Sequence, residues 1–309
     1  MYKKMLVVLD GSQLAEIVFP YTKELAGRLD IDVILLHVYS QIMRGYAPMY
    51  KAYIETAAKN IGMQAQQIQQ SSGMSKSAKP VEVRGELVMG YHADEILRFA
   101  EDNAVDLIIM ASHGRSGAQR WSIGSVADKI LRASKIPVWL IHADAEKILP
   151  FDQWPSRTLL VALSGSDISA IVIPHAIALA KQKGSPMDVV LMEVVEPPIT
   201  PTYYSPELTG MPLNWGQFVE QEIARSKKAA QEYLSGVEKQ FRDEGINVRS
   251  IVLTGKPAEE IVSYADKNPY TVVIMATHGR TGLSRLVYGS VAQSVLYGIT
   301  NPMVLIRPQ

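Results

Sequence analysis

Two stretches of this chain carry glycine, arginine and serine at the same spacing, in a pattern suited to binding an anion. Residues 107–131 read LIIMASHGRSGAQRWSIGSVADKIL, and residues 272–296 read VVIMATHGRTGLSRLVYGSVAQSVL. At an offset of 165 the two stretches agree at 13 of 25 positions without a gap. We therefore treat them as two copies of one candidate site.

The residue types of the first copy indicate how an anion would be held. Gly114 and Gly117 let the backbone adopt positive φ angles and approach a ligand closely. The pair Gly124-Ser125 opens a predicted helix, whose first N–H groups lack partners within the helix and whose dipole is positive at that end. Arg115 adds a cationic donor with fork geometry. Together these features predict a backbone cradle that suits a di- or triphosphate.

A second pair of matching segments extends the repeat to the whole chain. Residues 6–12 read LVVLDGS and residues 160–166 read LVALSGS, at an offset of 154. The two offsets differ by 11 residues, and the additional length falls in the Pro-rich stretch 196–216, which carries Tyr203, Tyr204 and Trp215. That stretch is open to two interpretations, a packed loop or a segment that covers the second site or binds a partner. We expect domains at 1–148 and 155–309.

Each copy alternates short apolar runs with helical segments. The first copy predicts strands at 5–9, 33–38, 81–84, 105–110 and 138–141, and helices from Ser12 to about Leu29, at 49–70, 93–103 and 126–133. Strands that are apolar on both faces and separated by helices indicate a parallel sheet covered on both sides. With right-handed crossovers, each copy is predicted to be a doubly wound, Rossmann-like α/β domain.

Ligands of doubly wound domains bind at the carboxyl ends of the strands, where the strand order reverses. Two turns of each copy would lie there. One follows the first strand and reads Asp10-Gly11-Ser12, or Ser164-Gly165-Ser166 in the second copy. The other follows the fourth strand and carries the glycine-rich pattern.

Composition excludes several functional classes. Lys and Arg (31) balance Asp and Glu (31), so there is no basic excess of the kind that nucleic-acid binders normally show. The absence of cysteine excludes disulfides, thiolate nucleophiles and Fe–S clusters. No apolar run is long enough to span a membrane, and the N-terminal one is too short for a signal peptide. We therefore expect a cytoplasmic protein with neither a nucleic acid nor a membrane as partner.

The pattern Ala-x-x-Gly-x9-Gly-Ser, at 111–125 and again at 276–290, resembles the ATP-binding signature of the universal stress protein family. The opening strand that ends in Asp-Gly-Ser and the closing Pro-Val-x-x-Ile strand are similar too. The resemblance covers essentially the whole chain as two tandem copies. It implies a 3-2-1-4-5 parallel sheet in each copy and an adenine nucleotide across the first and fourth strands, either ATP or an ADP- or AMP-type ligand, with Mg²⁺ as a companion ion.

By this resemblance Asp10 would lie near the adenosine, Val38 near the adenine and Ala111 near the ribose, while Gly114 and the segment 124–126 would hold the phosphates. The candidate binding set in the first copy is Asp10, Gly11, Ser12, Val38, Met110, Ala111, His113, Gly114, Arg115, Gly117, Gly124, Ser125 and Val126. In the second copy it is Ser164, Met275, Ala276, His278, Gly279, Arg280, Gly282, Gly289, Ser290 and Val291. No catalytic residue or protein metal ligand is assigned.

The chain departs from the family pattern in two places. The first glycine of the signature is alanine in both copies, at Ala111 and Ala276. Ser164 stands where the first copy has Asp10, so the second copy lacks that carboxylate. His113 and His278 precede the next glycine of the motif; without a matched acid or nucleophile, they are interpreted as bracing the loop or touching the ligand. His37 and His142 are interpreted as core or edge residues.

Three functional hypotheses follow. The first is a nucleotide-binding sensor or regulator of the stress response, the second a nucleotide-free interaction module, and the third an ATP-consuming enzyme, with slow hydrolysis as the minimal activity. Members of the family dimerise through the last strand. Here the strands at 138–141 and 304–306 are expected to pair within one chain as a pseudo-two-fold internal dimer, and the chain is expected to form a homodimer and to have a signalling partner.

Overall fold

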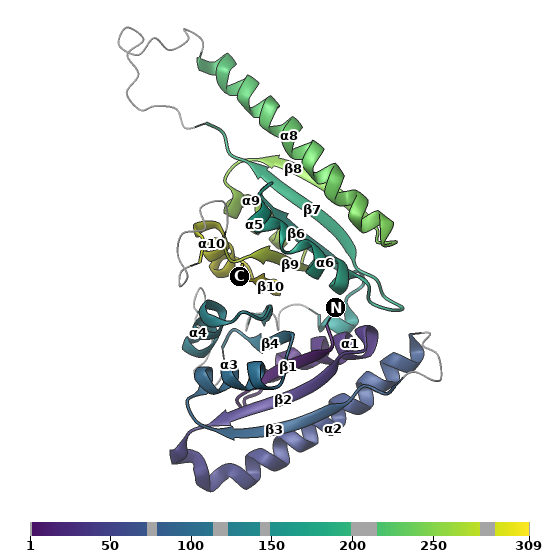
Figure 1. The fold of residues 1–309 in the computed structure, drawn as a ribbon, viewed down its shortest axis with the longest axis vertical. Coiled ribbons are helices and arrows are strands. Elements are labelled where there is room, and N and C mark those ends of the chain that lie inside the picture. Colours follow the sequence, from purple (N-terminus) through teal and green to yellow (C-terminus); the bar gives the residue numbers. More distant parts are fainter. Residues whose placement is uncertain are drawn as a thin grey trace.

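The computed structural model describes residues 2–72, 79–113, 123–142, 149–198, 215–278 and 288–308. Within them the strands form one ten-stranded sheet of order β3-β2-β1-β4-β5-β10-β9-β6-β7-β8 (Figure 1). The first half contributes β1 (Lys4–Leu9), β2 (Asp32–Tyr39), β3 (Val83–Met89), β4 (Leu107–Ala111) and β5 (Val138–Ile141). The second half contributes β6 (Thr158–Leu163), β7 (Asp188–Val195), β8 (Val248–Thr254), β9 (Thr271–Ala276) and β10 (Met303–Ile306).

The helices connect these strands in the same way in both halves. Those of the first half are the 3-10 helices η1 (Ala15–Val18) and η2 (Gln41–Tyr46), and α1 (Phe19–Leu29), α2 (Ala47–Ser71), α3 (His92–Asp102) and α4 (Ser125–Ala133). Those of the second half are α5 (Asp167–Ala170), α6 (Ile173–Ala180), α8 (Trp215–Asp243), α9 (Pro257–Lys267) and α10 (Ser290–Gly298). The short helix η4 (Phe151–Gln153) lies between the halves.

Both faces of the sheet are buried. Side chains alternate along a strand, so Met5 and Val7 of β1 point to one face and Leu6 to the other. Buried residues of α1, α2, α6 and α8 pack on the first face, and those of α3, α4, α9 and α10 pack on the second. The prediction of doubly wound α/β halves is confirmed, as is the strand order 3-2-1-4-5 within each half.

The two halves join through their last strands. β5 and β10 pair antiparallel, with Leu140 opposite Met303 and Val138 opposite Leu305. Every other strand pair of the sheet is parallel. The expected pairing within one chain is therefore confirmed, and the carboxyl ends of the strands in the two halves point in opposite directions.

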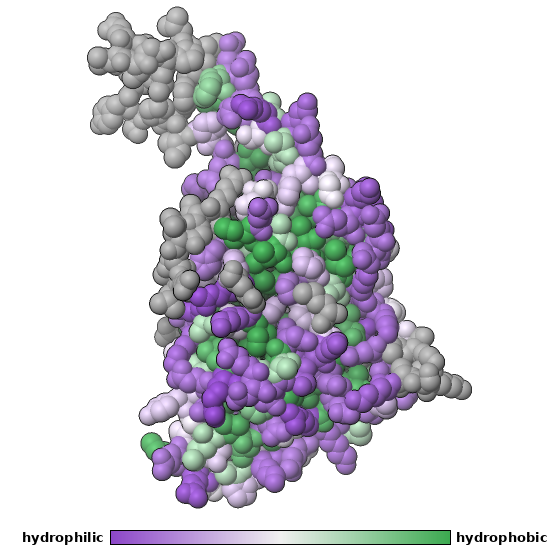
Figure 2. All heavy atoms as spheres, in the orientation of Figure 1, coloured by the Kyte–Doolittle hydropathy of each residue, from purple (hydrophilic) through white to green (hydrophobic). Residues whose placement is uncertain are grey.

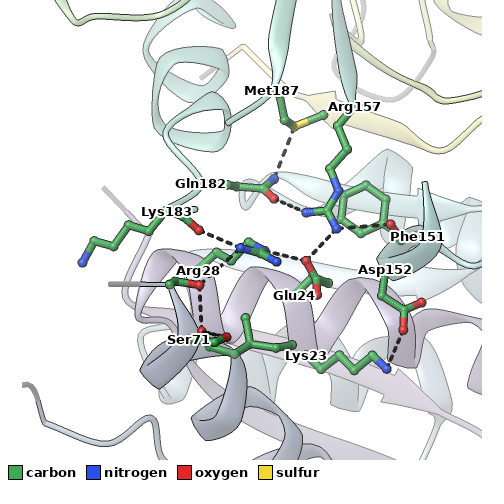
Figure 3. A network of polar contacts seen from close by, with 12 residues as sticks. Lys23, Glu24, Arg28, Ser71, Phe151, Asp152, Arg157, Gln182, Lys183 and Met187 are labelled. Carbon is green, nitrogen blue, oxygen red and sulfur yellow. Dashed lines mark hydrogen bonds and ion pairs between the residues drawn. The ribbon is translucent and has the colours of Figure 1, made fainter. Parts of the chain in front are cut away.

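A buried ion-pair network also ties the halves together (Figure 3). Arg157, just before β6, donates from Nη2 to Oε2 of Glu24 on α1 at 2.6 Å, and both side chains are only 5% exposed. Arg28 Nε donates to the same oxygen at 2.6 Å, and Arg157 Nη1 donates to Oε1 of Gln182 at 3.0 Å. One carboxylate of the first half thus neutralises a cation from each half.

Two expected boundaries are wrong. The third strand was expected at 81–84, yet β3 spans Val83–Met89. A Cβ on Gly85 would lie 2.8 Å from the carbonyl oxygen of Ile54, so this glycine lets α2 pack closely on β3 and does not end the strand. The first helix was expected to begin at Ser12. Its Oγ does accept a hydrogen bond from the N–H of Ala15 at 3.2 Å, but η1 follows and α1 begins only at Phe19.

Hydrophilic residues cover most of the face shown in Figure 2, and hydrophobic ones gather in patches along its middle. Among the described residues, no helix combines the length and apolar character that a bilayer crossing needs. The alternatives for Tyr203–Trp215 concern a stretch that, apart from the backbone start of α8, lies outside the described residues. The domain limits 1–148 and 155–309 stay a prediction.

Candidate functional site

The first half contains a cavity of about 410 Å³ at the carboxyl ends of β1 and β4. This is the place that the strand order predicts for a ligand, because the order reverses between these two strands. The cavity is lined by eight residues of the candidate binding set: Asp10, Val38, Met110, Ala111, His113, Gly124, Ser125 and Val126.

The turn after β1 holds Asp10 at the cavity. Gly11 has a φ of 77°, a conformation that suits glycine, and lets the chain reverse directly after the strand. Asp10 Oδ1 accepts hydrogen bonds from the backbone N–H of Ser12 at 3.0 Å and from its hydroxyl at 2.6 Å. Gly11 and Ser12 do not line the cavity, so within the described structure they shape the turn that presents the carboxylate.

The electrostatic surroundings of Asp10 include a half-buried phenol, that of Tyr53. Its hydroxyl donates a hydrogen bond to Oε1 of Glu16 at 2.8 Å. Partial burial raises the pKa of Tyr53, and the hydrogen bond to Glu16 and the negative charges of Glu16 and Asp10 raise it further. Tyr53 therefore stays a neutral hydrogen-bond donor beside an acidic turn.

The opposite wall of the cavity is the start of α4. Gly124 is the N-cap residue and offers no side chain to cap the helix, so the first N–H groups of α4 face the region that Ser125 and Val126 line. The N–H of Gly124 donates to the carbonyl oxygen of Ser112 at 2.9 Å. A Cβ on Gly124 would lie 3.1 Å from that oxygen, closer than most Cβ atoms pack.

The second half repeats this geometry in a larger cavity of about 840 Å³. Gly289 is the N-cap of α10, and its N–H donates to the carbonyl oxygen of Thr277 at 2.8 Å. Gly165 has a φ of 68°, close to that of Gly11 in the first half. Seven residues of the candidate set line the cavity: Ser164, Met275, Ala276, His278, Gly289, Ser290 and Val291.

Each motif histidine lies beside the hydroxyl group of the residue before it. Nδ1 of His113 lies 3.2 Å from the Ser112 hydroxyl, and Nδ1 of His278 lies 3.0 Å from the Thr277 hydroxyl. Nε2 of His278 is buried at the second cavity without a hydrogen-bond partner in the described part of the chain. A polar ligand atom would satisfy this nitrogen, so the residues present fit a bound polar group.

Part of the candidate set cannot be placed. Gly114, Arg115, Gly117, Gly279, Arg280 and Gly282 lie outside the described residues. Their contribution to an anion site remains a prediction from the sequence. The candidate residues nearest to the two undescribed segments, His113 and Gly124 in the first half and His278 and Gly289 in the second, line the cavities.

Sequence reasoning missed residues of the second strand and of the long helix in each half. His37 of β2 is buried at the first cavity, where its Nδ1 lies 3.0 Å from the carbonyl oxygen of Leu9 and its ring lies 4.4 Å from that of Tyr50. In the second half, Glu193 of β7 and Tyr233 of α8 line the cavity. Only the register of β2 on β1, which the residues do not spell out, would have revealed His37 as a cavity residue.

Comparison with known proteins fits this geometry. The sequence profile of the Universal stress protein family matches residues 1–142 and again residues 155–307. The chain belongs to the universal stress protein family. A universal stress protein of Mycobacterium tuberculosis (strain H37Rv) is 25% identical over 312 residues, which cover 98% of this chain and 96% of that protein.

Solved structures share the fold of the whole chain. A crystal structure from Archaeoglobus fulgidus covers 98% of this chain and 98% of its own, with a TM-score of 0.60 and 21% identity. A functionally unknown protein from Pseudomonas aeruginosa PAO1 covers 99% of this chain and 93% of its own, with a TM-score of 0.67 and 18% identity. These likenesses show that the fold of the whole chain is shared with both structures.

Proposed function

We propose that this universal stress protein binds an adenine nucleotide, with ATP as the reference ligand, in each of its two cavities and acts as a cytoplasmic stress-response regulator. The observation that carries the proposal is the repeated pairing of a cavity at the carboxyl strand ends with a helix whose N-cap is glycine. Uncapped N–H groups and a positive helix dipole favour phosphate binding at such a place. The resemblance of the sequence motif to the family's ATP signature supports the choice of ligand.

The cavity walls suit the parts of a nucleotide. The segment 124–126 would hold the phosphates, Ala111 would lie beside the ribose, and Asp10 and Val38 would lie near the adenosine and the adenine. Among the described residues, no group of three or more His, Asp or Glu side chains is placed to hold a metal ion. Mg²⁺ would therefore enter with the phosphates, neutralising their charge.

Regulation requires no chemistry at these sites. A ligand that binds one conformation better than another shifts the population toward it by its differential affinity alone. Nucleotide bound only to the folded protein also raises its stability in proportion to the logarithm of nucleotide concentration. We propose that a signalling partner binds the conformation that the nucleotide favours.

Native mass spectrometry of the freshly purified protein, followed by acid release and nucleotide analysis, tests the proposal. Two bound adenine nucleotides per chain are expected. One nucleotide would restrict the proposal to a single cavity. No nucleotide, with no uptake of added ATP, would contradict the proposal and favour a nucleotide-free interaction module. Steady phosphate release that Gly124→Val abolishes would instead indicate an ATP-consuming enzyme.

Asp10→Ala should weaken ATP binding in the first cavity alone. Loss of a hydrogen bond to a charged group costs about 1.5–3 kcal/mol, which corresponds to roughly a tenfold to hundredfold drop in affinity. Titration calorimetry with both sites resolved would measure the change, and Asp10→Asn, which keeps an acceptor oxygen, should lose less. An equal loss at both cavities would contradict independent sites.

We further propose that the chain forms a homodimer. Because β5 and β10 pair with each other, the strands at the two edges of the sheet are β3 and β8. Edge strands present unpaired N–H and C=O groups that another chain can use. Light scattering of the purified protein would show a mass near twice 34.1 kDa, whereas a monomeric mass would contradict the proposal.

A further inference from the structure

The second cavity has a carboxylate in a different place from the first. Ser164 occupies the position of Asp10, and its hydroxyl lies 3.0 Å from that of Ser166. The turn after β6 therefore offers hydroxyl groups where the turn after β1 offers a carboxylate. A buried carboxylate at this cavity belongs to Glu193, which has 6% of its surface exposed.

Strand register identifies the equivalent position in the first half. On β7, Glu193 lies opposite Leu163, the last residue of β6. On β2, His37 lies opposite Leu9, the last residue of β1. Glu193 thus takes the place of His37, one strand away from the position of Asp10.

The Glu193 carboxylate reaches across to the turn after β6. A Cβ built on Gly165 would lie 3.2 Å from Oε1 of Glu193, so this oxygen is close to the backbone of the turn that carries Ser164. Tyr233 of α8 lines the same cavity. Partial burial raises the pKa of Tyr233, and the negative charge of Glu193 raises it further.

We propose that Glu193 is the ligand-binding acid of the second cavity and accepts hydrogen bonds from the 2′- and 3′-hydroxyls of a ribose. The proposal rests on the nucleotide-binding function proposed above. In doubly wound dinucleotide-binding folds, an acid downstream of the first turn binds the ribose hydroxyls. Glu193 lies on the second strand of its half, two residues before the strand ends at Val195. The two cavities consequently bind the same class of ligand with acids from different strands.

Discrimination between ATP and 2′,3′-dideoxy-ATP tests this assignment. The experiment uses the full chain with Gly124→Val, so that only the second cavity is measured by calorimetry. Glu193→Gln should weaken ATP binding roughly tenfold to hundredfold, as expected for a lost charge-assisted hydrogen bond. The affinity for 2′,3′-dideoxy-ATP should be the same before and after Glu193→Gln, because that ligand has no ribose hydroxyl to donate.

Two further variants separate the outcomes. Glu232→Gln removes an exposed carboxylate of α8 that does not line the cavity and should leave ATP affinity unchanged. Ser164→Asp, added to Glu193→Gln, should restore part of the lost affinity by supplying the acid from the position used in the first half. Circular dichroism of each variant without nucleotide checks that the fold is retained.

ATP binding that is insensitive to Glu193→Gln would overturn the role of Glu193 while leaving nucleotide binding intact. An equal loss for ATP and for the dideoxy analogue would overturn the ribose contact. If the chain with Gly124→Val but intact Glu193 takes up no ATP, the proposed function itself fails at the second cavity, and the role of Glu193 fails with it.

Discussion

Replacing Gly124 by valine should abolish tight ATP binding in the first cavity. A Cβ at this position would already lie 3.1 Å from the Ser112 carbonyl oxygen, so the larger side chain must displace the Ser112–His113 segment or fill the cavity mouth. Loss of two charge-assisted hydrogen bonds at about 1.5–3 kcal/mol each would lower the affinity roughly a hundredfold or more. Calorimetric titration of the full chain would measure this loss.

The same substitution should leave the protein folded. Gly124 has a φ of −59° and a ψ of 147°, values that any residue adopts at an N-cap. Gly289→Val is the matched variant, and it should affect the second cavity alone. Gly124→Ala should have a smaller effect than Gly124→Val. If Gly124→Val binds ATP as tightly as the natural chain, the helix start is not the phosphate site.

Glu24→Gln should destabilise the protein by about 3–5 kcal/mol, the cost of breaking a buried ion pair by removing one partner. Glu24 accepts hydrogen bonds from both Arg28 and Arg157, and the Arg157 side chain is 5% exposed. The variant therefore leaves a buried cation with no compensating charge at position 24. Urea unfolding followed by fluorescence would report the change, because the buried Trp139 and Trp154 lie in the hydrophobic layer beside Phe151.

Arg157→Met should cost less than Glu24→Gln, because Glu24 then keeps its partner Arg28. The double variant should be no less stable than Glu24→Gln alone, since residues of one network do not contribute additively. Lys181→Ala removes one partner of the half-exposed Lys181–Glu244 pair and should cost at most about 1 kcal/mol. If Glu24→Gln and Lys181→Ala lower the free energy of unfolding by similar amounts, the buried network has no special role in stability.

Most of the fold could be predicted from the sequence, because both copies of the repeat in the chain show the same order of strands and helices. Apolar runs separated by helical segments indicated buried parallel strands, and two copies of the closing strand indicated where the halves meet. The end of β3 was missed because Gly85 and Glu86 interrupt the apolar pattern. An edge strand such as β3 tolerates them, since its residues are only partly buried.

The position of a candidate residue at a cavity was predictable where it depends on neighbours in sequence. The Gly-Ser pair that opens α4 and the carboxylate of Asp10 are examples, since a turn and a helix start are local features. His37 and Glu193 were missed because their presence at a cavity depends on the register of one strand on another. The Glu24–Arg157 pair joins residues 133 positions apart, and no local sequence pattern predicts such a contact.

The antiparallel pairing of β5 with β10 has a consequence for the protein at low abundance. An interface between separate chains dissociates on dilution, because the fraction of chains that are associated depends on their concentration. Here both strands belong to one chain, so the pairing is unimolecular and the covalent connection between the halves gives it a high effective concentration. The relative placement of the two cavities is therefore the same in a cell that holds a few copies as in one that holds thousands.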